Sequence, residues 1–241
     1  MFKEFIKNEF KNWLRDPMMR FMLFYPILFG IIGRYILPMV AENSGFSIDM
    51  FADFILVFLT LMIPVIYGAV IGFSILDDRD DNVLKSVKVT PLSIDQFLSF
   101  RMIIAVVLTV IACIYVIWFS NIAEISFLNM VLISILAALA APVSGLFINA
   151  FASNKVEGFA IMKGSGAILI FPLVALYFTD YKEFFFSFAP GFWPAKAIST
   201  LIRGEEILPL NFWLYYLIGL IYVIILNVFM YRFFLKRTMS D

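Results

Sequence analysis

The sequence predicts an all-α polytopic membrane protein, with six transmembrane helices in a single domain spanning residues 1–241. The first observation is composition, since 63% of the residues are hydrophobic and only 15% are charged. A soluble chain carries about a quarter charged residues to cover its surface. The second is that six apolar windows approach the roughly 20 residues that a helix needs to cross the hydrocarbon core. No long polar stretch is left to build a soluble domain.

The six windows have the length of helices and lack the alternating pattern of barrel strands. The fifth is short and is interrupted by Gly164, Gly166 and Pro172. We expect the spans at about residues 21–40, 54–76, 102–119, 127–148, 161–178 and 212–234.

The distribution of lysine and arginine predicts the orientation of these spans. Six spans put both termini on the same side as the loops 77–101 and 149–163. That side carries fourteen basic residues: Lys3, Lys7, Lys11, Arg15, Arg20, Arg79, Lys85, Lys88, Arg101, Lys155, Lys163, Arg232, Lys236 and Arg237. The other side carries four: Arg34, Lys182, Lys196 and Arg203. We therefore expect a multi-pass protein of the cell membrane (plasma or inner membrane) with both termini in the cytoplasm.

The first 17 residues predict an amphipathic helix on the cytoplasmic leaflet. Basic residues recur every fourth position from Lys3 to Arg15, which stacks them along one face. The other side is apolar, with Phe2, Phe5, Ile6, Phe10, Trp13 and Leu14. Asp16-Pro17 ends this helix. The alternative is a basic end that only sets topology. No small-residue cleavage site follows the first span, so we expect a retained helix and no signal peptide.

Several functions are disfavoured by what the sequence lacks. There are no histidines and a single cysteine, Cys113, which counts against histidine-dependent hydrolases and metalloenzymes. We expect no catalytic, cofactor-binding or metal-binding residues. The equal numbers of basic and acidic residues give no net field for nucleic acid. Arg34 is the one ionisable candidate inside a span, and either it reaches the outer interface or it pairs with Asp53.

Small residues and prolines mark positions where helices approach closely or bend. Gly68 and Gly72 form a G-x-x-x-G pair in the second span. A stripe of small residues in the fourth span comprises Ala137, Ala141 and Gly145. Such stripes let helix backbones touch in lipid, so we expect helix–helix contacts there. Pro64, Pro142 and Pro172 break the helical hydrogen bonds at mid-depth, in a static bundle or as bend points.

The cytoplasmic segment 77–101 predicts a short ordered helix followed by the start of the third span. Four aspartates fall where the short helix begins and two lysines fall in its last turn, both favourable for the helix dipole. Thr90-Pro91 stops this helix, and Ser93 with Gln96 has the spacing of a capping box. Either this is a solvated loop, or it is a charged knob that docks into a groove on another protein.

The outer segment 179–211 is too apolar for a solvated loop. Its aromatic residues are dense between 184 and 193, and Pro190 and Pro194 interrupt it. A helical pattern resumes at residues 195–203. We therefore expect a re-entrant helical hairpin that dips into the outer leaflet before the last span.

Two stretches resemble the type-two ABC export permeases. Residues 78–84 (DRDDNVL), followed by 89–93 (VTPLS), resemble the signature after that family's second span. Residues 189–204 (APGFWPAKAISTLIRG) resemble its Pro-rich hairpin before the last span, with Pro190, Trp193, Pro194, Arg203 and Gly204 as the matching positions. Asp stands here where the family often has Glu, and Asn82-Val83 where it often has Gly-Thr. Within the family, the chain is most similar to small drug- and peptide-export permeases, including fluoroquinolone-export permeases.

This resemblance implies a half-transporter. Two permease copies, or one copy and a related permease, form the path through the membrane lipid, and two separate ATP-binding subunits dock beneath. The chain has no G-x-x-x-x-G-K-[ST] loop, so ATP and Mg²⁺ are expected on the partner, with no cofactor in this chain. The residues expected to couple to the ATPase are Asp78, Arg79, Asp80, Asp81, Val83, Leu84, Val87, Thr90 and Pro91.

Two other classes remain open at this stage. One is a membrane-embedded enzyme, which the absence of histidine and of polar clusters at one depth disfavours. The other is a non-transporting membrane sensor or immunity subunit with the same fold. An ATP-binding cassette protein encoded beside this chain would favour export over both.

The basic bias generates a labelling experiment. In a Cys113→Ala background, single cysteines at Ser47 and Glu205 should react with an impermeant maleimide added outside intact cells, whereas a cysteine at Ser86 should react only after the membrane is opened. Labelling at position 86 in sealed cells would contradict the predicted orientation.

Overall fold

The computed structural model describes residues 2–45, 47–81, 83 and 93–238, and within these residues the chain is helical, without strands. Six segments are long and apolar enough to cross a membrane: Pro17–Ser44, Asp49–Asp80, Ile94–Ser120, Phe127–Phe151, Lys155–Ala175 and Phe212–Arg237. The six-span prediction is confirmed. The fifth segment begins six residues earlier than we expected, because Asn154 caps its first turn by accepting from the amides of Val156 and Glu157.

Breaks divide these spans into shorter helices. The elements are α1 Phe2–Arg15, α2 Pro17–Leu23, α3 Tyr25–Ile31, the π-helix η1 Ile32–Ile36, α4 Leu37–Ser44, η2 Asp49–Phe51, α5 Ala52–Asp80, α7 Ile94–Ser120, α8 Phe127–Ala138, α9 Ala140–Phe151, α10 Lys155–Gly166, η3 Ala167–Leu169, α11 Ile170–Ala175, η4 Tyr181–Phe186, α12 Phe192–Arg203 and α13 Phe212–Thr238.

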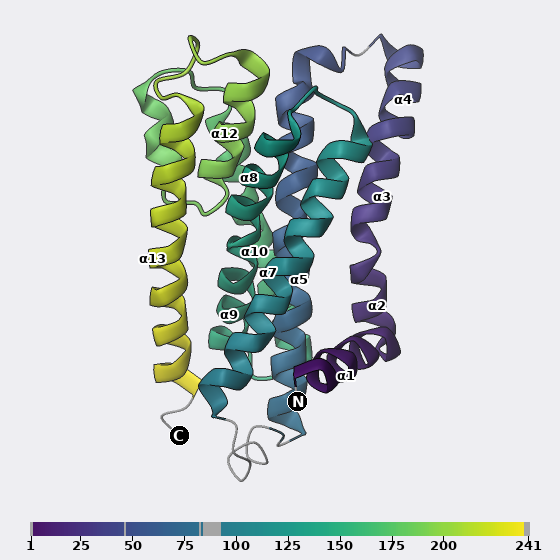
Figure 1. Ribbon diagram of the computed structural model, residues 1–241, viewed down its shortest axis with the longest axis vertical. Coiled ribbons are helices and arrows are strands. Elements are labelled where there is room, and N and C mark those ends of the chain that lie inside the picture. The colour runs from purple at the N-terminus through teal and green to yellow at the C-terminus, as the bar shows by residue number, and fades with distance from the viewer. Residues whose placement is uncertain (1, 46, 82, 84–92, 239–241) are drawn as a thin grey trace.

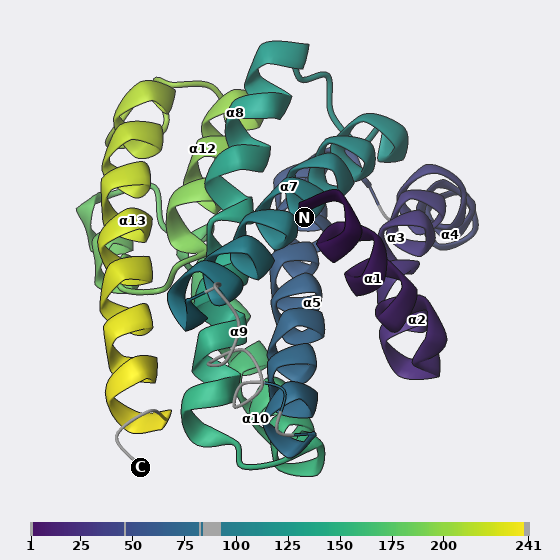
Figure 2. The ribbon, with the colours of Figure 1, turned by 60° about the horizontal axis from the view of Figure 1, so that its bottom comes forward.

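The bundle is built around α5, which forms most of the most buried of the six spans, Asp49–Asp80. Its most extensive contact is with α9, and it also packs against α7, α10 and α12. Helix α13 and the α3–α4 pair lie on opposite flanks (Figures 1 and 2). We call the end of the bundle that holds α1 and both chain termini the terminal end, and the opposite end, which holds α12, the distal end (Figure 1).

Side chains from neighbouring helices contact backbone carbonyls near two of the mid-span prolines. Pro64 has no N–H for the carbonyl of Thr60, yet α5 continues, and the Cys113 thiol on α7 lies 3.8 Å from that oxygen. The fourth span breaks at Leu139, three residues before Pro142. There the Asn227 amide on α13 donates to the Leu139 carbonyl at 2.8 Å. In lipid, such bonds replace the water that would otherwise satisfy the backbone.

The predicted small-residue positions of the second and fourth spans face each other between α5 and α9. A Cβ atom built on Gly68 would lie 2.4 Å from the carbonyl oxygen of Ala141. One built on Gly145 would lie 2.8 Å from the carbonyl oxygen of Gly68, and one on Gly72 would lie 3.2 Å from the Cβ of Ile148. The two backbones are therefore in direct contact, as in other small-residue interfaces of membrane helices. Ala137 is fully buried one turn from Ala141.

The terminal end also shows the expected helix boundaries. The amphipathic helix is present as α1, and Asp16 caps α2 by accepting from the amides of Met18 and Met19. Ser93 and Gln96 form the predicted capping box at the start of α7. The expected short helix before it falls mainly on residues 82 and 84–92, which lie outside the described residues.

The α5–α9 contact generates a stability prediction. Gly68→Ala should lower the stability of the fold by about 1–3 kcal/mol, since the added methyl overlaps a backbone carbonyl that cannot move aside. The matched control is Gly164→Ala on α10, where an added Cβ meets nothing within 4 Å and alanine favours the helix. Thermal unfolding in one detergent compares them. Equal midpoints for the two variants would contradict a close α5–α9 contact.

Candidate functional site

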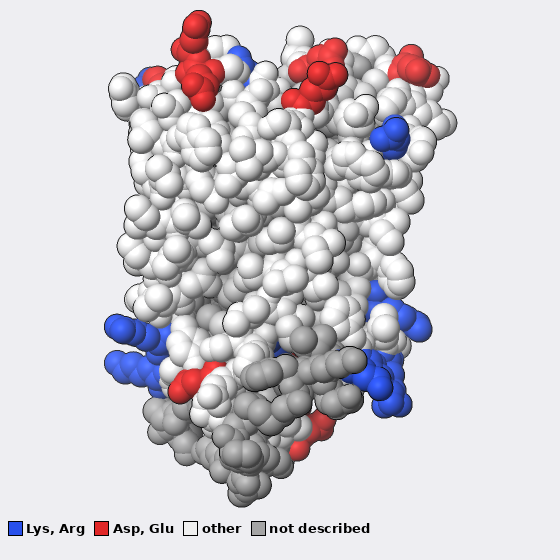
Figure 3. Space-filling model, in the orientation of Figure 1, with Lys and Arg blue, Asp and Glu red and all other residues white. Residues whose placement is uncertain are grey.

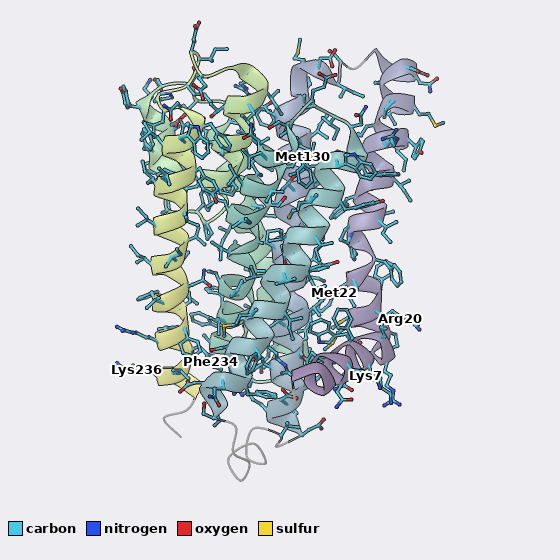
Figure 4. All side chains as sticks on the ribbon, in the orientation of Figure 1. Lys7, Arg20, Met22, Met130, Phe234 and Lys236 are labelled. Atoms are coloured by element: carbon cyan, nitrogen blue, oxygen red, sulfur yellow. The ribbon has the colours of Figure 1, made fainter. Side chains whose placement is uncertain are left out.

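Three polar or hollow regions distinguish this bundle from a plain apolar one: ion pairs at the terminal end, ion pairs at the distal end, and a cavity between them. Figure 3 shows that charge gathers at the two ends of the molecule and leaves a wide uncharged band between them. Figure 4 places Lys7, Arg20 and Lys236 at the terminal end. Both observations match the way that a membrane protein distributes its charges.

Arg101 forms the most buried ion pairs of the terminal end. Its guanidinium, two turns inside α7, meets Glu9 of α1 in a bidentate pair, with Nε 2.7 Å from Oε1 and Nη2 3.0 Å from Oε2. Its Nη1 also pairs with Asp78 of α5. Glu9 and Arg101 are each only 3% exposed. Bidentate pairing of this kind satisfies charges that would otherwise be costly to bury.

Further polar contacts extend this arrangement into the bundle. The Ser74 hydroxyl on α5 donates to Glu9 at 3.0 Å, and the Trp13 indole donates to Ser74 at 3.3 Å. Trp13 is almost fully buried, so one face of α1 is anchored by both an aromatic ring and a carboxylate. The ring of Phe97 covers the guanidinium of Arg101 at 4.8 Å.

Lys155 forms a second bridge beside the first. Its ammonium, at the start of α10, lies 2.7 Å from Asp16 and 2.8 Å from Asp77. Partial burial alone would raise the pKa of the Asp16 carboxyl, but Lys155 and the amides of Met18 and Met19 stabilise the carboxylate, and its pKa is lowered overall. The Asp16–Lys155 attraction is therefore present above the ordinary carboxyl pKa and is lost as pH falls through the lowered value.

The predicted coupling residues divide into three groups. Asp78 and Arg79 face into the protein, and Arg79 donates to the carbonyls of Asn149 and Ala152 at 3.3 Å. Asp80 and Asp81 are exposed, and Val83 is half-buried against the core. Leu84, Val87, Thr90 and Pro91 lie outside the described residues.

At the distal end, Asp53 holds the C-terminal end of α12. Its carboxylate is 2% exposed and accepts from Arg203 at 2.7 Å and from Ser199 at 3.0 Å. The alternative pairing of Asp53 with Arg34 is therefore wrong. Arg34 is exposed and donates to the Phe119 carbonyl at 3.2 Å. Arg203 outcompetes Arg34 because α12 packs directly against α5.

A second distal pair is completely enclosed. The Lys196 ammonium lies 2.6 Å from Glu183, and both side chains have no exposed surface. Lys196 also donates to the Phe178 carbonyl at 2.7 Å, and the Tyr215 hydroxyl on α13 donates to Glu183. This pair joins the two arms of the hairpin, η4 and α12, to the last span. The insertion of this hairpin into the outer leaflet stays a prediction.

The other predicted hairpin residues surround these pairs. Trp193 and Pro194 are buried in the first turn of α12, and Trp193 packs against Gly219 of α13. Gly204 has φ of 98°, a conformation that suits glycine, and ends α12. Pro190 lines the cavity described next.

A cavity of about 90 Å³ lies between α5, α9, the α10–α11 span and the hairpin. Two of the three mid-span prolines line it, Pro64 and Pro172, together with Pro190. Its walls are otherwise apolar except for Ser144 and Ser165, whose hydroxyls donate to carbonyls of their own helices. The cavity therefore offers shape and apolar contact and presents no charge.

The roles of five ionisable residues were not predicted from sequence. Arg101, Lys155 and Lys196 were counted only as markers of orientation, and Glu9 and Glu183 were not considered. Glu9 had a detectable signal, since it lies one turn before Trp13 on the apolar side of the amphipathic helix. A carboxylate on such a face requires a buried cation.

Comparison with known proteins decides the family. The family model described as "Fluoroquinolones export permease protein Rv2686c-like" matches residues 9–231. The chain belongs to this family. It is 27% identical over 200 residues to the fluoroquinolones export permease proteins Rv2686c and MT2760 of two Mycobacterium tuberculosis strains, H37Rv and CDC 1551. The match covers 80% of this chain and 79% of each relative. The chain is thus a multi-pass membrane permease, and the resemblance to the fluoroquinolone-export permeases that the sequence indicated is confirmed.

The enclosed distal pair generates a prediction on stability. Lys196→Met leaves Glu183 charged in a dry site and should cost about 3–5 kcal/mol, whereas Lys196→Met with Glu183→Leu should recover most of this loss. Lys182→Met is the matched control. This lysine is in the same segment with a side chain 77% exposed, and its loss should cost less than about 0.5 kcal/mol. If Lys196→Met unfolded at the wild-type temperature, the enclosed pair would be refuted.

Proposed function

We propose that this chain is the permease subunit of an ATP-driven ABC exporter, which moves a drug, peptide or lipid-like substrate out of the cell with a separate ATP-binding subunit. The observation that carries the proposal is the family match over residues 9–231, on a chain with six spans. The names of the relatives make a fluoroquinolone the first cargo to test.

The sequence and the architecture support a separate energy source. The chain has no P-loop, and its described residues are taken up by the membrane bundle and its short connections. The exposed Asp80 and Asp81 at the end of α5 support an attachment point for the ATPase at the terminal end. Closure of the ATPase on ATP would then act on α5 and α7, the helices on either side of the predicted coupling segment. Of these two helices, α5 lines the cavity.

The size of the cavity supports a second permease copy or a related permease. Pockets that enclose drug-sized ligands measure about 300–1,000 Å³, several times more than the cavity here. This cavity is too small to surround such a cargo. The path must widen, and a second copy beside the bundle supplies the other wall. Because the cavity carries no charge, cargo is selected by shape and apolar surface.

Transport and docking can be tested together. Cells that express this chain with a candidate ATP-binding cassette protein should accumulate less of a fluorescent fluoroquinolone than cells with either protein alone. Asp80→Lys and Leu84→Asp should each weaken co-purification of the ATPase more than tenfold, since loss of an anchoring interface contact costs about 2 kcal/mol or more. Membrane insertion should stay normal.

The control is Glu124→Lys, an exposed acid at the distal end, which should alter neither measurement. If both loop variants retained the ATPase and lowered drug accumulation as the wild type does, the attachment point would lie elsewhere. If the wild-type pair failed to lower accumulation of fluoroquinolones, peptides or labelled lipids, the export function itself would be refuted.

A further inference from the structure

The two bridges of the terminal end share one design. In each, a single cation lies between two carboxylates, one from the N-terminal helices and one from the end of α5. Arg101 joins Glu9 to Asp78, and Lys155 joins Asp16 to Asp77. Among residues 7–16, whose side chains the structure describes, these are the ion pairs to the rest of the bundle.

The divergence of the two bridges follows from helix geometry. Asp77 and Asp78 are consecutive, so their side chains point about 100° apart around α5, since the helix has 3.6 residues per turn. One carboxylate therefore reaches α10 and the other reaches α7. The last full turn of α5 is fixed from two directions, and each fixing contact also holds the N-terminal helices.

Asp16, which lies between α1 and α2, links the start of α2 to Lys155. One of its oxygens accepts from the amides of Met18 and Met19 and so caps α2. The other oxygen bonds Lys155 at 2.7 Å. Because a single carboxylate does both, the corner between α1 and α2 cannot turn independently of α10.

The N-terminal helix therefore has more contacts than membrane anchoring requires. A helix that only floats on the leaflet needs an apolar face and exposed basic residues, and Lys7, Lys11 and Arg15 are exposed. Anchoring does not require a buried Glu9 or a bidentate Arg101, which are costly to desolvate. Both contacts attach α1 to the two helices that border the predicted coupling segment, α5 and α7.

We propose that α1 is a moving part of the coupling apparatus, carried with the ends of α5 and α7 by the two bridges when the ATPase closes. This proposal rests on the proposed function. Arg101 and Lys155 are then positioning residues, which act through the helices that they join. Motion imposed at residues 78–81 reaches α1 and, through Asp16 and Lys155, the start of the fifth span.

The second carboxylate in each bridge allows the ionic link to the N-terminal helices to be removed without leaving Arg101 or Lys155 unpaired. Glu9→Gln with Asp16→Asn removes only the N-terminal acid of each bridge and leaves Arg101 paired with Asp78 and Lys155 paired with Asp77. No buried charge is left alone, and asparagine still caps a helix well. This release variant should therefore insert and fold. Glu42→Gln with Glu124→Gln, two exposed acids at the distal end, is the matched control.

The measurement is amide hydrogen exchange of the permease–ATPase complex in nanodiscs, without nucleotide and with a non-hydrolysable ATP analogue. In the wild type and the control, residues 2–15 and 77–81 should change protection together. In the release variant, the change at 77–81 should persist and the change at 2–15 should be lost. Substrate stimulation of ATP hydrolysis should be lost with it, while the thermal midpoint stays near that of the wild type.

Three outcomes would overturn the proposal. A response at 77–81 with none at 2–15 in the wild type would show that α1 is a passive anchor, although the export function would stand. A release variant that kept the response at 2–15 would show that the bridges do not carry it. Failure of the wild-type permease to bind the ATPase would refute the proposed function, and this inference with it.

Discussion

A buried charge in an apolar bundle must be paired, and this constraint organises both ends of the molecule. Arg101 with Glu9 and Asp78 fixes the terminal end, and Lys196 with Glu183 fixes the distal hairpin. Removing one partner of such a pair is far more damaging than replacing the whole pair. The helices joined by each pair are thereby fixed in register, and the apolar band between the ends needs no charge of its own.

The middle of the bundle follows a different rule, that of close backbone approach. Without a hydrophobic drive between helices in lipid, α5 and α9 associate through contact at Gly68 and Gly145. The Thr60 carbonyl, which Pro64 leaves without a backbone donor, is contacted by Cys113, and the Leu139 carbonyl at the interruption of the fourth span accepts from Asn227. The centre is therefore tightly joined between α5 and α9 and more open toward α10 and α11, where the cavity lies.

Much of the fold was predictable because its signals are local. Apolar length gave the six spans, and the Ser93–Gln96 spacing gave the start of α7. The ion pairs were not predictable, since their partners are far apart in sequence, 92 residues for Glu9 and Arg101. Asp53 shows the difficulty. From sequence only Arg34 was considered as its partner, and the pairing with Arg203 follows from the position of α12 against α5.

The interruption at Leu139 is the position at which the fourth span can bend. Each of its halves, α8 and α9, has 12 residues and measures about 18 Å at 1.5 Å per residue. Helix α9 is fixed to α5 by the glycine contact, so a bend at Leu139 would move α8. By simple trigonometry on that length, a tilt of about 10° displaces the far end of α8 by about 3 Å. That displacement is about the width of a water molecule, and it occurs at the distal end of the bundle without the loss of a helical turn.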